Sequence, residues 1–79
     1  SFATGRLSLR CDGELIQAMS RQLDIPAASC QESGLHGLGH WQPRAPELIE
    51  RIVDRYLARS DILPELRAYA LEARDGSVL

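Results

Sequence analysis

Apolar residues recur every three to four positions along most of this chain, and that spacing predicts helices rather than strands. The pattern is clearest over residues 46–59, where Pro46 supplies a helix start. The apolar face of this helix consists of Leu48, Ile49, Ile52, Val53, Tyr56 and Leu57. Its opposite face carries Glu47, Glu50, Arg51, Asp54, Arg55 and Arg59. The division predicts an amphipathic helix with one side packed against a core.

Three further helices follow from the same spacing and from local start and stop signals. The first is predicted over residues 13–24, with Asp12 as its N-cap. The second is predicted over residues 26–38 because proline is accepted in a first helical turn. The last is predicted over residues 64–74, just before a glycine. Residues 1–11 show no strong period, so they are expected to form a loop or the end of a preceding helix.

A repeat connects the two halves of the chain. The sequence Glu-Leu-Ile at residues 14–16 recurs 33 positions later, at residues 47–49. With an offset of 36, four further positions align: Cys30 with Leu66, Gly34 with Ala70, Leu35 with Leu71, and Gly37 with Ala73. A period of this length is typical of stacked helical hairpins. The sequence therefore predicts an all-α fold over residues 12–79: two stacked antiparallel hairpins forming an α-solenoid fragment.

The spacing also predicts which residues lie inside this fold. The expected core contains Leu15, Ile16, Met19, Leu35, Leu38, Ile49, Ile52, Val53, Tyr56, Leu66 and Ala70. Gly34 and Gly37 are one helical turn apart, and each costs about 1 kcal/mol relative to alanine in a helix. We expect them to let a neighbouring backbone approach closely. Cys30 is expected as a small core residue, at the opposite end of its hairpin from Cys11, so both thiols should be free.

Several of these residues resemble the second helix of HEAT-type repeats. They are Arg67-x-x-Ala70 in the last helix, the small residues Gly34 and Gly37, and the ending Leu38-Gly39. The resemblance covers about residues 12–76, and the chain departs from it at Gln31, where an arginine would be expected. It implies a scaffold or binding platform without catalytic residues. Because each hairpin needs a neighbour to cover its apolar face, the chain is interpreted as the C-terminal pair of repeats of a larger bacterial protein.

Composition narrows the functional classes. The net charge of the chain is −2, and all nine basic residues are arginines, as expected from a GC-rich bacterial genome. This charge does not favour nucleic acid as a partner. No apolar run approaches the roughly 20 residues that span a bilayer, and no signal peptide is visible. We therefore expect a cytoplasmic protein whose partner is another protein or the remainder of its parent chain.

No set of nucleophile, base and orienting residue is apparent, so a non-catalytic interaction or scaffolding module without a cofactor is predicted. The open edge of the two hairpins is expected on the N-terminal side, where Phe2, Leu7 and Leu9 precede any helix that would cover them. Trp41, placed in the loop between the hairpins, is a candidate partner contact, with packing over the hairpin ends as its alternative.

His36 and His40 are the candidate metal ligands, with Cys11 as a third that a hairpin would bring near them. Histidines four residues apart share one face of a helix and can bind a metal ion together. However, Gly39 is expected to end the helix as its C-cap, which would separate the pair. The sequence therefore predicts ordinary histidines near a helix end and no metal site.

DNA binding is the alternative function. Residues 14–38 resemble a helix-turn-helix, and Arg51, Arg55 and Arg59 form a stripe that could meet phosphates. Acidic residues interrupt the stripe, and the second helix of the helix-turn-helix carries Glu32 and no basic residue. Both features favour a solvated surface over a DNA interface.

Overall fold

The computed structural model describes residues 4–78 and, from Asp12 onward, their side chains. These residues form four helices and no strand: α1 (Thr4–Gln22), α2 (Ala28–Trp41), α3 (Pro46–Leu57) and α4 (Pro64–Asp75). The prediction of an all-α fold is confirmed over this range.

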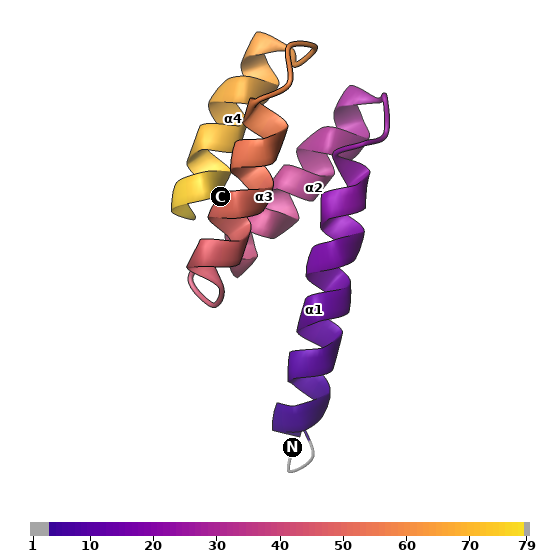
Figure 1. Cartoon of the computed structure of the whole chain (residues 1–79), viewed down its shortest axis with the longest axis vertical. Helices are drawn as coiled ribbons and strands as arrows, with labels where there is room; N and C mark the ends of the chain where they lie inside the picture. The colour runs from indigo at the N-terminus through magenta and orange to yellow at the C-terminus, as the bar shows by residue number, and fades with distance from the viewer. Residues whose placement is uncertain (1–3, 79) are drawn as a thin grey trace.

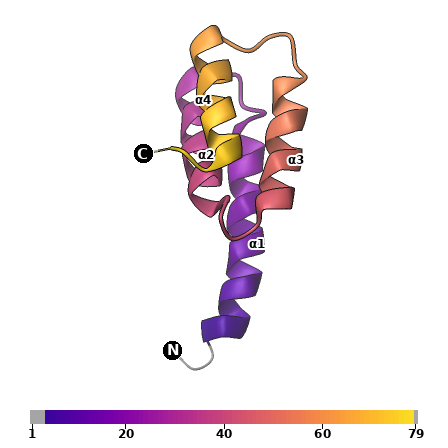
Figure 2. The ribbon, with the colours of Figure 1, turned by 90° about the vertical axis from the view of Figure 1, so that its left-hand side faces the viewer.

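The helices alternate in direction along the long axis of the molecule, so that α1 and α2 form one antiparallel hairpin and α3 and α4 form another (Figure 1). Helix α2 packs against both α1 and α4, and α3 packs chiefly against α4. The N-terminal half of α1 projects beyond the other three helices in both views (Figures 1 and 2). This projection accounts for the elongated shape, 44 × 22 × 20 Å.

Helix α1 begins much earlier than the sequence predicted. It starts at Thr4, so Asp12 lies within the helix and the prediction that it is an N-cap is wrong. Gly13, the one helix-weakening residue after Asp12, is tolerated because a glycine costs only about 1 kcal/mol in a helix interior. The stretch that was expected to be loop or a separate helix end is, from Thr4 onward, the first half of α1.

Helix α2 is longer than predicted at its C-terminal end. It begins at Ala28, continues through Gly39 and ends at Trp41, with Gln42 as the C-cap. The prediction that Gly39 is the C-cap is therefore wrong. Gly39 is buried, and a Cβ placed there would overlap the Val78 side chain, so this glycine provides space for packing rather than a turn.

The second hairpin matches its predicted boundaries closely. Pro46 and Pro64 each occupy the first turn of their helix. Gly76 ends α4 in the left-handed conformation, with φ of 76°, which glycine adopts without steric cost. The amides of Gly76 and Ser77 donate to the carbonyls of Ala73 and Glu72, which satisfies two of the last carbonyls of α4.

The core agrees with most of the predicted list. Its buried apolar residues are Ile16, Leu23, Leu35, Leu38, Ile49, Ile52, Val53, Tyr56, Leu66, Ala70, Ala73 and Val78. Leu15 was placed in the core wrongly, because its side chain is 49% exposed. Met19 is half-buried against the core. Helix α1 has α2 as its principal neighbour, so only a narrow stripe of its surface is covered.

The internal repeat is reflected in burial at some positions and not at others. Ile16 and Ile49 are both buried, while the leucines that precede them are both exposed. Gly34 and Ala70 are also both buried. The match fails at the next position, where Leu35 is buried and Leu71 is exposed.

Gly34 marks a close contact between α1 and α2. A Cβ at this position would lie 2.7 Å from the carbonyl oxygen of Met19 and 3.1 Å from Cβ of Gln22. A Cβ at Gly37 would instead overlap the Met19 side chain. The predicted close approach of a neighbouring backbone is thus confirmed at Gly34, whereas at Gly37 the neighbour is a side chain.

Candidate functional site

A groove lies between α1 and α3. The two helices make few contacts with each other, because α1 packs mainly against α2 and α3 packs mainly against α4. Its volume is about 520 Å³. It is lined by Gly13, Glu14, Ile16, Gln17 and Ser20 of α1 and by Leu48, Ile52 and Arg55 of α3. We call this surface the α1/α3 groove. Ile16 and Ile52 are almost fully buried, while Leu48 is 39% exposed, so the groove offers apolar surface to a binding partner.

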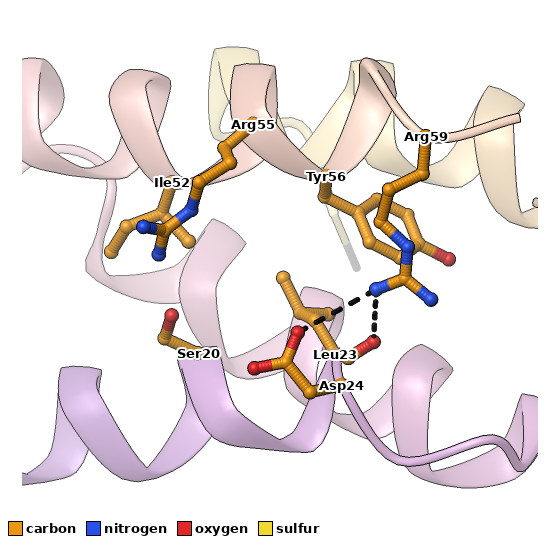
Figure 3. A pocket seen from close by; sticks show the side chains of 7 residues that line it. All are labelled: Ser20, Leu23, Asp24, Ile52, Arg55, Tyr56 and Arg59. Carbon is orange, nitrogen blue, oxygen red and sulfur yellow. Dashed lines mark hydrogen bonds and ion pairs between the residues drawn. The ribbon is translucent and has the colours of Figure 1, made fainter.

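A smaller pocket of about 120 Å³ lies beside the C-terminal end of α1 (Figure 3). Ser20, Ile52 and Arg55 line both spaces, so the two adjoin. The pocket is completed by Leu23, Asp24, Tyr56 and Arg59.

Arg59 joins the end of α1 to the end of α3 at this pocket. Its Nη1 donates a 2.6 Å hydrogen bond to the carbonyl oxygen of Leu23 and lies 3.7 Å from Oδ1 of Asp24 (Figure 3). Its Nε donates to Asp61 at 3.2 Å, and this hydrogen bond lowers the pKa of the Asp61 carboxyl below its ordinary value. Because the guanidinium has these partners, Arg59 holds the end of α3 against the end of α1 and is not free to bind a ligand.

The three arginines that were predicted to form one stripe therefore do not share one free surface. Arg51 and Arg55 are exposed on α3, but Arg59 follows the end of that helix and is engaged with backbone and carboxylate groups. Asp54, which precedes Arg55 on α3, forms an ion pair with Arg74 of α4 at 2.7 Å. These contacts give the DNA-binding alternative little support through this face.

The structure also gives little support to DNA binding through a helix-turn-helix at residues 14–38. Helix α2 packs against α1 and α4 and, less extensively, against α3, which leaves one narrow exposed face. That face carries Ala28, Ser29, Glu32, Ser33, His36 and His40. It contains a carboxylate and no arginine, whereas a recognition helix contacts phosphates with basic side chains.

The two histidines lie together on this face. Because α2 continues through Gly39, His36 and His40 are one turn apart on one helix, and the predicted separation of the pair is wrong. Their Nε2 atoms are 3.2 Å apart, and Nδ1 of His36 shares a 2.8 Å hydrogen bond with the Tyr69 hydroxyl of α4. Among the described side chains, no group of three His, Cys, Asp or Glu residues is placed to hold a metal ion. The Cys11 side chain lies outside them.

Tyr69 was missing from the predicted sites. Nothing local in the sequence connects it with His36, which is 33 positions away. The contact arises because α4 packs beside α2. Burial raises the pKa of the Tyr69 phenol above its ordinary value, so the hydroxyl stays neutral at physiological pH.

The other candidate residues are distributed over separate surfaces. Trp41 is the last residue of α2 rather than part of a loop, and it is half-buried against the core with the Arg44 guanidinium 4.7 Å from its ring centre. Leu7 and Leu9 are on the projecting half of α1, although their side chains, like the whole of Phe2, lie outside the described part.

Cys30 carries a free thiol and is half-buried. It aligns with Leu66 in the repeat, which is buried, so its interpretation as a small residue at the edge of the core agrees with its position. The expectation of a free thiol at Cys11 concerns a side chain outside the described part.

Comparison with protein-family models, with characterised proteins and with solved structures finds no match to this chain. Within residues 4–78, no helix is both long and apolar enough to cross a membrane.

Proposed function

We propose that this chain is a non-catalytic interaction or scaffolding module that binds an amphipathic helix of another polypeptide segment in the α1/α3 groove. The observation that carries the proposal is the groove itself: an apolar floor between two helices with polar residues along its edges. Helix-in-groove binding uses this arrangement, with apolar side chains of the bound helix spaced by one turn.

Leu48 is the central contact in this proposal. It is apolar, 39% exposed and located on the wall of the groove, whereas the apolar residues beneath it are buried. Full burial of a leucine contributes about 1.5–3 kcal/mol, so covering Leu48 would contribute part of that free energy to binding. Glu14 and Arg55 at opposite sides of the groove provide charges that can orient the bound helix.

The projecting half of α1 extends the proposed surface. No other described helix lies beside it in either view (Figures 1 and 2). By its residue range, this half of α1 contains Leu7 and Leu9. A partner that enters the groove can continue along this half of the helix. In this proposal the bound partner also covers the N-terminal edge, which was predicted to be open at Phe2, Leu7 and Leu9.

We further propose that the two hairpins are HEAT-like repeats from the C-terminal part of a longer α-solenoid. Support comes from the two antiparallel hairpins, from the packing of α2 on α4, and from the shared burial of Ile16 with Ile49 and of Gly34 with Ala70. In that arrangement, the occupant of the groove is a helix of the parent protein or of a partner bound along the solenoid.

Site-specific photo-crosslinking tests the proposal. A photoreactive amino acid is placed at Leu48, and in a matched variant at Leu71, which is 52% exposed on α4 and outside the groove. The expected result is one crosslinked polypeptide species in native extract from position 48 that is absent from position 71. The same products from both positions, or none from either, would contradict binding in the groove.

A further inference from the structure

The exposed histidines of α2 have the spacing of two ligands on one metal ion. Two nitrogen ligands of a tetrahedral zinc ion, each about 2.0–2.1 Å from the metal, lie roughly 3.3–3.4 Å from each other. The Nε2 atoms of His36 and His40 are 3.2 Å apart. The backbone holds them there because both belong to one continuous turn of α2, so metal binding requires little rearrangement.

Tyr69 supplies the outer contact that a metal-binding histidine normally has. Its hydroxyl is 2.8 Å from Nδ1 of His36, and its ring is partly buried against the core, which fixes its position. When Nδ1–H donates to this hydroxyl oxygen, the lone pair of Nε2 points away from α4 and toward His40. Such a hydrogen bond holds the imidazole in the tautomer and orientation that ligation requires.

We propose that His36 and His40 bind a divalent transition-metal ion, with Zn²⁺ as the ion of reference, through their Nε2 atoms. Binding replaces the contact between the two nitrogens by two metal–nitrogen bonds, and the proton between them in the neutral pair moves to Nδ1 of His40, so that both Nε2 lone pairs face the metal. Imidazole nitrogens favour Zn²⁺, Cu²⁺ and Ni²⁺ over Ca²⁺ and Mg²⁺, which prefer oxygen ligands. Both side chains are exposed, so the remaining coordination positions face outward for water or for ligands of a bound partner.

Titration of Zn²⁺ into the purified chain tests the site, with calorimetry for affinity and ¹⁵N NMR of the imidazole rings for the ligand atoms. The expected result is saturable binding that shifts the Nε2 resonances of His36 and His40. His36→Ala and His40→Ala should each weaken binding by at least about 10-fold, and Tyr69→Phe by about 10-fold, because loss of an outer-shell partner typically costs 10–100-fold in metal affinity.

Two controls separate this site from adventitious binding. Glu32→Gln removes a carboxylate one turn before His36 on the same exposed face and should leave the affinity for Zn²⁺ unchanged. Ca²⁺ should not compete. Circular dichroism verifies that each variant keeps its helices. Unchanged Zn²⁺ affinity in the two histidine variants, ring resonances that do not move, or no binding up to millimolar Zn²⁺ would overturn the proposal.

Discussion

Tyr56 of α3 donates a 2.7 Å hydrogen bond from its hydroxyl to Oε1 of Gln31 of α2, and both side chains are buried. The Gln31 amide in turn donates to the carbonyl oxygen of Ile25 at 2.8 Å. One side chain therefore ties α3, α2 and the loop after α1 together. The pair also gives a physical reason for glutamine at the position where the HEAT resemblance would place arginine, because arginine has no acceptor for the Tyr56 hydroxyl.

Tyr56→Phe is expected to lower the free energy of unfolding by about 1–3 kcal/mol, because it leaves the buried oxygen of Gln31 without a donor. The measurement is chemical denaturation followed by circular dichroism. Tyr69→Phe is the matched control, since it removes a hydroxyl whose hydrogen bond is exposed, and it should cost less. An equal loss of unfolding free energy in the two variants would show that the buried hydrogen bond stabilises the fold no more than the exposed one.

Two glycine-to-alanine variants should change stability in opposite directions. Gly34→Ala places a methyl group against the Met19 carbonyl, and such overpacking typically destabilises by about 1–3 kcal/mol. Gly13→Ala, within α1, meets no atom within 4 Å and should stabilise by about 0.5–1 kcal/mol through helix propensity. Denaturant midpoints measure both. A stabilising Gly34→Ala would contradict the close contact of α1 with α2.

Stability in acid should depend on the ion pair between α3 and α4. Arg74 donates two hydrogen bonds to the Asp54 carboxylate, at 2.7 and 3.2 Å, and these lower the pKa of Asp54 below its ordinary value of 3.8. A carboxyl with a lowered folded-state pKa stabilises the fold above its unfolded-state pKa, and this contribution is lost as pH falls through the folded-state value.

The difference in unfolding free energy between the wild-type chain and Asp54→Asn isolates this effect. It should be constant from about pH 7 to pH 5 and should decline as pH falls below 3.8 and through the lowered folded-state pKa of Asp54, where the wild-type carboxyl becomes protonated as well. Because the pair is exposed, the difference should be small and should shrink in high salt. A difference that persists unchanged at low pH would show that Asp54 acts through something other than its charge.

Local signals predicted the second hairpin well and the first hairpin only in part. Pro46, Pro64 and Gly76 have strong preferences for helix starts and stops, and the structure follows them. Asp12 and Gly39 gave similar signals, but α1 begins before Asp12 and α2 continues through Gly39. Gly39 remains helical because Val78, 39 positions later, packs against it, and no local rule encodes that contact.

The candidate sites depended even more on tertiary packing. The period of the chain identified Leu15 and Leu48 as apolar helix positions, but it could not show that both are exposed. Leu48 lines the groove between α1 and α3, whereas Leu15 belongs to a helix whose principal neighbour is α2 alone. The spacing of His36 and His40 was visible in the sequence. Their proximity required α2 to continue through Gly39, and their outer partner Tyr69 required α4 to lie beside α2.

The projecting half of α1 should matter for association and little for folding. Replacing Leu7 and Leu9 together by aspartate is expected to abolish association with the partner captured by crosslinking, while α3 and α4 keep their amide NMR spectra. The reason is that charges on this half of α1 would have to be buried under the partner. Association that is unaltered in the double variant would contradict the prediction of an open N-terminal edge.

The most direct test of the central claim is the dissociation constant of the crosslinked partner, or of its contacting helix as a peptide, for Leu48→Asp and for Leu71→Asp. Both changes place a carboxylate at an exposed leucine, but only Leu48 lines the α1/α3 groove. Leu48→Asp should weaken binding by at least about 10-fold, since burial of a leucine side chain is worth about 1.5–3 kcal/mol. Leu71→Asp should leave binding within about 2-fold of wild type. Equal effects of the two changes, or none from Leu48→Asp, would contradict binding in the groove.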